Sequence, residues 1–158
     1  MDRSAITDHY LTAGSEYLEA LRRLELDPEG LMWAVDTVSG QKVLLLITSL
    51  FDIAGPLKLS ELLFRAYNAS ATPKDISPFI VEMHSPQQDF VDSFYSIYTI
   101  RIEESGTGKM IELGPMHLGP YTIFRDWVYQ FRAPSVAKPS LDHRFRRFER
   151  KVQALKAA

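Results

Sequence analysis

Residues 31–51 read LMWAVDTVSGQKVLLLITSLF, and the rest of the architecture can be built outward from this segment. Its first part, at 31–36, is apolar and favours a strand, and a turn follows at 38–41. The next run, at 43–51, is almost continuously apolar, which is typical of a strand that is covered on both faces. We therefore expect this second strand in the centre of a sheet with protein on both sides.

The segments that flank this pair of strands predict helices. Residues 7–26 carry apolar side chains at helical spacing. Pro28 ends this helix, because proline disfavours helical geometry in the residue before it. After the strands, Gly55 and Pro56 open a second helix that runs to about Asn68, with leucines at the spacing of a core-facing stripe.

Residues 79–84 alternate in the manner of a half-buried strand. Its two faces are Phe79, Val81 and Met83 on one side, and Ile80, Glu82 and His84 on the other. Ser85 and Pro86 then provide the N-cap and the first-turn proline of a helix. Farther on, residues 99–113 predict a hairpin about a glycine-containing turn.

Residues 121–132 fit two patterns. Their β-branched and aromatic residues favour a strand. A helical stripe is also present, and it consists of Ile123, Phe124, Trp127, Val128 and Phe131. On the strength of this stripe and of the polar residues opposite it, we favour a helix.

The chain ends in a cationic amphipathic helix. Apolar residues recur at spacings of four, three, four and three, which places them on one stripe of a helix. This stripe consists of Leu141, Phe145, Phe148, Val152 and Leu155. The basic residues beside it and opposite it are Arg144, Arg146, Arg147, Arg150 and Lys151. Such a helix has to place its apolar stripe against its own domain, a second copy or another molecule.

Together these elements predict an α+β protein. We expect a single domain with a mixed or largely antiparallel sheet of about five strands, helices packed on it and the amphipathic C-terminal helix. Residues 1–133 form the core domain in this interpretation. Residues 134–158 form a proline-containing spacer and the basic helix, either as part of the same domain or as an arm that docks on a partner.

Charge is divided unevenly between these two parts. Residues 133–158 hold seven basic and two acidic side chains, a net charge of +5, while the remainder holds eleven basic and eighteen acidic ones, a net charge of −7. This asymmetry predicts either that the tail docks on the acidic body or that it binds an anionic partner.

The composition limits the chemistry. The chain has no cysteine, which excludes disulfides, thiolate metal sites and cysteine nucleophiles, and fits a reducing, cytoplasmic location. The start of the chain lacks the pattern of a secretory signal. The longest mostly apolar run, at 43–51, is too short to cross a bilayer, so we expect no membrane span.

Few motifs point to catalysis. Gly106-Thr107-Gly108-Lys109 shares part of a phosphate-binding loop, but the first glycine is missing and Met110 replaces the serine or threonine, so a hairpin turn is the better interpretation. Glu82 and His84 share one strand face and are the pair to test for a metal site or general base chemistry, but a solvent-facing strand edge is the better interpretation. His117 lies between two Gly-Pro turns, where functional loops often occur. We expect no catalytic residue, no metal ligand and no cofactor.

These observations favour a non-catalytic accessory or adaptor protein that binds a protein partner and self-associates through the stripe of its C-terminal helix. An alternative is a nucleic-acid-binding regulator that uses the five basic residues of that helix, since they suffice for phosphate contacts. A third is a small enzyme with a pocket near His84 or His117.

Overall fold

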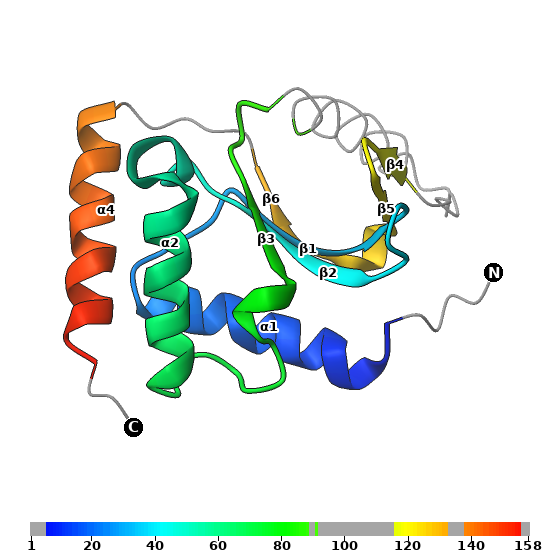
Figure 1. Ribbon diagram of the computed structural model, residues 1–158, viewed down its shortest axis with the longest axis horizontal. Coiled ribbons are helices and arrows are strands. Elements are labelled where there is room, and N and C mark those ends of the chain that lie inside the picture. The colour runs from blue at the N-terminus through cyan, green and yellow to red at the C-terminus, as the bar shows by residue number, and fades with distance from the viewer. Residues whose placement is uncertain (1–5, 89–90, 92–115, 133–137, 156–158) are drawn as a thin grey trace, which may run out of the picture.

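The computed structural model describes residues 6–88, 91, 116–132 and 138–155. Within these residues the chain forms one α+β domain with three α-helices and a six-stranded mixed sheet (Figure 1), which confirms the predicted fold class. The predicted hairpin at 99–113, with its glycine-rich turn, lies outside the described residues. None of the helices in the described ranges is long and apolar enough to cross a membrane.

The helices are α1 (Asp8–Arg23), α2 (Phe51–Asn68) and α4 (Lys138–Gln153), and the single-turn 3₁₀ helices are η2 (Pro78–Ile80) and η3 (Arg125–Trp127). The strands are β1 (Gly30–Asp36), β2 (Lys42–Ile47), β3 (Val81–His84), β4 (Met116–Leu118), β5 (Tyr121–Ile123) and β6 (Val128–Phe131). Helix α2 contains a break at Gly55, whose φ of 80° is accessible to glycine, and Pro56 restarts the helix as predicted.

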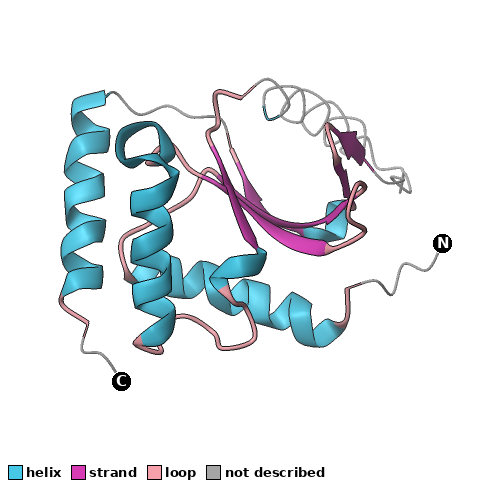
Figure 2. Cartoon of the chain, viewed as in Figure 1, coloured by secondary structure: helices cyan, strands magenta, loops and turns pink. Residues whose placement is uncertain are grey.

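The sheet has the order β3-β2-β1-β5-β4, with β6 also paired to β1. Strand β2 is antiparallel to β1 and parallel to β3, so it is an interior strand, as its apolar sequence predicts. Both of its faces are buried: Leu44 and Leu46 pack with the helices, and Val43 and Leu45 pack in a second core on the other face. Figure 2 shows the three helices gathered around one side of the sheet.

The helix predicted for residues 121–132 is wrong. The segment forms β5, the single turn η3 and then β6, and both strands pair antiparallel with β1. Strand β5 meets the end of β1 at Val35 and Asp36, while β6 meets its beginning at Gly30 and Met32. Because β1 is buried, its second edge needs partners for its backbone groups, and this requirement outweighs the helical spacing of the segment.

Strand β6 is held against α1 by a buried polar contact. Trp33 Nε1 donates to Oη of Tyr129 at 2.9 Å, and Tyr129 Oη donates to the backbone oxygen of Leu11 at 2.7 Å. The approach requires a glycine in α1, because a Cβ at Gly14 would lie 2.2 Å from the Tyr129 hydroxyl oxygen. Gly14, a small residue in the apolar stripe of α1, therefore leaves the space in which the ring of Tyr129 packs.

The segment that leads into α2 is anchored to the residue before β1. Glu29 is buried, and its carboxylate accepts hydrogen bonds from the backbone N–H and the hydroxyl of Ser49, two residues before the helix. The contact fixes α2 relative to the start of β1.

Strand β3 is shorter than predicted. The sequence predicts a strand at 79–84, but the strand begins at Val81, and Pro78–Ile80 forms η2. The Ser77 hydroxyl accepts from the N–H of Phe79 at 3.2 Å, which caps this turn. The ring of Phe79 consequently leaves the face of Val81 and Met83 and is 84 % exposed.

Candidate functional site

The apolar stripe of the C-terminal helix packs on the chain's own core. Figure 1 shows α4 beside α2, and Phe148 and Val152 are 0 % exposed in the core that α1, α2 and the sheet share. Phe145 and Leu155 pack against the same core, and Leu141 is half-buried. The structure thus brings the predicted residues together on one helix face, but the centre of this face, Phe148 and Val152, is not accessible on the folded chain.

The basic face of α4 makes ionic contacts with the body. Arg147 forms an ion pair with Glu25, and a guanidinium nitrogen of Arg144 donates to the backbone oxygen of Asp27 at 3.1 Å. The hydrogen bond from Arg147 lowers the pKa of Glu25. Arg146, Arg150 and Lys151 are exposed. Part of the charge asymmetry is therefore explained by docking of the basic helix on its own acidic body.

A cavity of about 820 Å³ lies where the C-terminal ends of α1, α2 and α4 meet, and three basic side chains line it, Arg23, Lys74 and Lys151. The Lys74 ammonium donates to the backbone oxygen of Tyr67 at 3.0 Å and lies 4.8 Å from the centre of its ring. Helix C-termini carry partial negative charge, which basic side chains stabilise. We therefore assign this cluster a structural role.

Glu82 and His84 converge on a tyrosine from another strand. Tyr121 Oη donates to the carboxylate of Glu82 and lies 3.0 Å from Nε2 of His84, while His84 Nδ1 lies 2.8 Å from Oε1 of Gln88. Strand β3 lies at the edge of the sheet, as the strand-edge interpretation requires, but Glu82 and His84 are half-buried rather than solvent-facing. Their register beside Leu45 and Ile47 turns them toward the second core, where the curled sheet brings β5 close to β3.

The electrostatics of this cluster favour neutral groups. Burial lowers the pKa of His84 despite the opposing effects of Gln88 and Glu82. Burial and the hydrogen bond to Glu82 raise the pKa of the Tyr121 hydroxyl. A protonated tyrosine and a neutral imidazole next to a carboxylate form a hydrogen-bonded link between β3 and β5.

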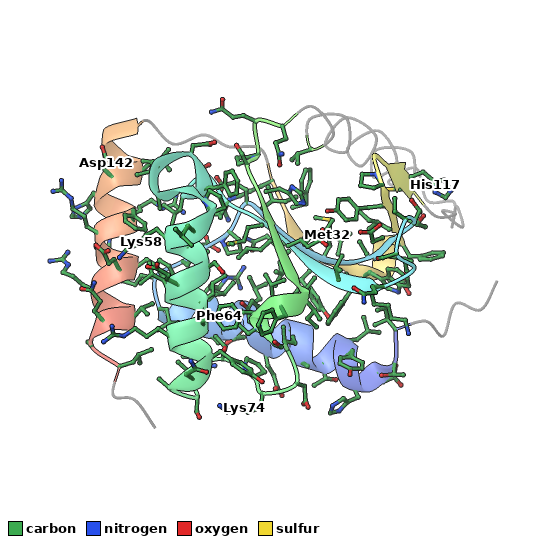
Figure 3. The ribbon with its side chains drawn as sticks, in the orientation of Figure 1. Met32, Lys58, Phe64, Lys74, His117 and Asp142 are labelled. Carbon is green, nitrogen blue, oxygen red and sulfur yellow. The ribbon has the colours of Figure 1, made fainter. Side chains whose placement is uncertain are left out.

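His117 is not part of this cluster. It lies on β4, labelled in Figure 3, and its Nδ1 is 3.1 Å from the hydroxyl oxygen of Thr122. Successive residues of a strand project to opposite faces, so Thr122 and Tyr121 place their partners on different sides of β5. Across the ranges that the structure describes, no three histidine, aspartate or glutamate side chains gather as a metal-binding group.

An apolar surface lies on the outer side of α2 and on η2. Phe79 packs edge to face on Phe64, with ring centres 4.8 Å apart, and Leu57 on the same side of α2 is 74 % exposed. Figure 3 shows Phe64 at the point where α2 meets η2. We call Leu57, Phe64 and Phe79 the apolar face. Exposed apolar side chains that lie together mark candidate interaction sites.

A cavity of about 530 Å³ opens beside the apolar face. Leu57 and Phe64 line one part of it, and Ala69 and Leu155 line another. Its charged rim consists of Glu61 and Arg65, and Arg65 donates to the backbone oxygen of Gln153 at 3.3 Å. The face therefore combines exposed apolar side chains, a concave receptor and charges of both signs.

The sequence contained a weak signal for this face. Leu57 and Phe64 are seven residues apart, which places them on one side of α2, but off the buried stripe of Leu59, Leu62 and Leu63. The position of Phe79 could not be read in this way, because its exposure depends on η2.

Comparison with protein-family models, with curated proteins and with solved structures finds no match to this chain.

Proposed function

We propose that the protein is a non-catalytic accessory protein that binds a protein partner through the apolar face. The main support is the edge-to-face pair of the half-buried Phe64 and the exposed Phe79, which lies on the same side of α2 as the exposed Leu57. Covering an apolar side chain of this size gains about 1.5–3 kcal/mol, so three of them supply enough free energy to offset part of the cost of association. Aromatic anchors next to a small cavity are typical of protein interfaces.

The proposal differs from the expectation that the C-terminal stripe forms the interface. Phe148 and Val152 are fully covered by the chain's own core, so a partner could use them only if α4 left the domain. Helix α4 instead borders the cavity beside the apolar face, through Leu155 in its wall and the backbone of Gln153 at Arg65.

Site-specific photo-crosslinking of the full-length chain in cells tests the proposal. We expect p-benzoylphenylalanine at position 79 to form a covalent adduct with a protein, and we expect Leu57→Asp in the same chain to abolish it. Position 38 is the matched control, because Val38 is also an exposed apolar residue, at 87 %, but lies on the turn between β1 and β2. Equal adducts at 38 and 79, or an adduct at 79 that survives Leu57→Asp, count against the proposal.

A second candidate function is the binding of an anionic partner such as nucleic acid. It is supported by a cavity of about 460 Å³ that His143, Arg147, Arg150 and Lys151 line together with Glu25. Binding to duplex DNA or RNA that falls steeply with salt, and that Arg150→Gln with Lys151→Gln removes, supports this candidate. Binding that is insensitive to salt and to these changes rejects it.

The enzyme near His84 or His117 is not proposed, because the two histidines lie in separate contacts and the groups around His84 bond to one another. A cytoplasmic location stays part of the proposal, since a chain without cysteine suits a reducing compartment.

A further inference from the structure

We infer that the partner on the apolar face is a second copy of this chain, with the two α2 helices antiparallel about a twofold axis. The inference rests on the proposed protein-binding function and names its partner. In a twofold interface both copies use the same patch. Each contact between a residue of one copy and a different residue of the other therefore occurs twice, with the roles of the two copies exchanged. A suitable patch must therefore be complementary to itself when it is turned around.

The charges of α2 meet this requirement. Glu61 and Arg65 are one turn apart and both exposed on the side of the helix that carries the apolar face. A twofold axis that passes between Glu61 and Arg65 places Glu61 opposite the partner's Arg65. The same rotation places Arg65 opposite the partner's Glu61, so two ion pairs form. A parallel arrangement in register would instead place like charges together, at a cost in free energy.

The neighbouring charges do not oppose this pairing. Lys58 is already bound to Glu149 of the same chain at 3.1 Å, and Arg65 is held at the rim of the face by its hydrogen bond to the backbone of Gln153. In the described part of the chain Glu61 forms no ion pair. The axis therefore gives Glu61 a partner without breaking an existing one.

The shape of the face is self-complementary in the same sense. Leu57 projects at one end of the exposed side of α2, and the cavity walls formed by Asn68, Ala69 and Leu155 lie at the other end. The axis that joins Glu61 to the partner's Arg65 brings each Leu57 to the Asn68 end of the other copy. The two Phe64–Phe79 pairs then lie near the axis, where central aromatic anchors contribute most to affinity.

Sedimentation equilibrium of the full-length chain and its charge variants tests the inference. We expect the wild-type chain to be a dimer. Glu61→Arg and Arg65→Glu each place like charges across the axis, and each should weaken the dimer by roughly tenfold or more. The double variant, with both substitutions in one chain, should recover the wild-type affinity. An equimolar mixture of the two single variants should form a heterodimer, because each charge pair across the axis then joins an arginine of one copy to a glutamate of the other.

Glu19→Arg is the matched control, since it makes the same charge change at an exposed position of α1, and it should leave the dimer unchanged. All substituted positions are exposed, and thermal unfolding checks that each variant folds. A wild-type chain that stays monomeric up to millimolar concentration overturns the inference, as does a mixture that does not associate. In either case, an adduct to a different protein at position 79 that Leu57→Asp abolishes would leave the proposed function standing.

Discussion

The apolar stripe of α4 and the apolar face of α2 contain similar side chains but differ in what covers them. In α4, Phe148 and Val152 are fully buried in the core. On α2 and η2, Leu57 and Phe79 remain largely exposed. The stronger amphipathic pattern in the sequence thus belongs to the helix whose apolar stripe is already satisfied. An amphipathic pattern identifies residues that need covering, but it does not say whether the same chain covers them.

Deletion of residues 140–158 is the most severe way to test this contrast. It removes Phe148 and Val152 from the core and exposes the part of α2 on which α4 packs. We expect the truncated chain to lose its cooperative unfolding transition, as followed by circular dichroism in urea. A truncated body with a cooperative transition would show that α4 is an appendage and would restore the docking arm predicted from the sequence.

Single substitutions separate the two regions more finely. Phe148→Ala should lower the free energy of unfolding by about 3–5 kcal/mol, because it leaves a cavity in a packed core. Phe79→Ala removes the same kind of ring from an exposed position. In the monomeric state it should change the free energy of unfolding by less than about 0.5 kcal/mol. Chemical denaturation of both variants at low protein concentration provides the measurement. Similar losses for the two phenylalanines would contradict the contrast.

Gly14→Ala tests the covered side by adding volume rather than removing it. The new Cβ would meet the Tyr129 hydroxyl, so the tyrosine must move and its bonds to Trp33 and Leu11 are lost. We expect a destabilisation of about 1–3 kcal/mol, measured by thermal unfolding. A double-mutant cycle with Tyr129→Ala is informative, because the hydroxyl and the ring atoms that the new Cβ meets are all removed, so Gly14→Ala should cost little in that background. An equal cost of Gly14→Ala with and without the tyrosine ring would refute the steric explanation.

The link between β3 and β5 is also partly buried, but it consists of the polar groups of Glu82, His84 and Tyr121 instead of apolar side chains. Burial lowers the pKa of His84 below its ordinary value of about 6.5, so the unfolded chain takes up this proton at higher pH than the folded chain does. The contribution of His84 to stability is therefore intact above the ordinary pKa and is lost as the pH falls from there through the lower pKa of the folded state. Glu82, Gln88 and Tyr121 face the ring.

Urea denaturation as a function of pH measures this effect. His84→Gln should flatten the decline on the acid side, while His143→Gln, at an exposed position of α4, should leave the profile unchanged. A profile that keeps its decline in His84→Gln would assign the pH dependence to other groups.

The smallest expected effect concerns the ion pair of Glu25 and Arg147, which joins α4 to the end of α1. Both groups are largely in solvent, where an ion pair contributes little and is screened by salt. We expect a double-mutant cycle with Glu25→Gln and Arg147→Gln to give a small coupling free energy at low salt that vanishes at high salt. A large coupling would mean that charge, rather than the apolar stripe, holds α4 on the body.

Helix α1, the hairpin of β1 and β2, most of α2 and helix α4 could all be predicted, because the spacing of apolar residues is a local property that survives in the fold. Residues 121–132 could not, because the free edge of β1 recruited a segment about a hundred residues away and overrode its helical spacing. The apolar face was missed for a related reason. It joins Phe64 of α2 to Phe79 of η2, and no spacing along the chain connects them.

The amino-acid order alone thus specified the class of the fold, the strand with two buried faces and the amphipathic nature of the last helix, since each follows from periodicity along a short segment. Long-range packing settled which apolar residues remain uncovered. Phe148 is buried in the core on the helix side of the sheet, whereas Phe79 was turned outward by the capped turn at Ser77. Burial depends on which segments meet in space, and that is a property of the whole chain rather than of any one pattern within it.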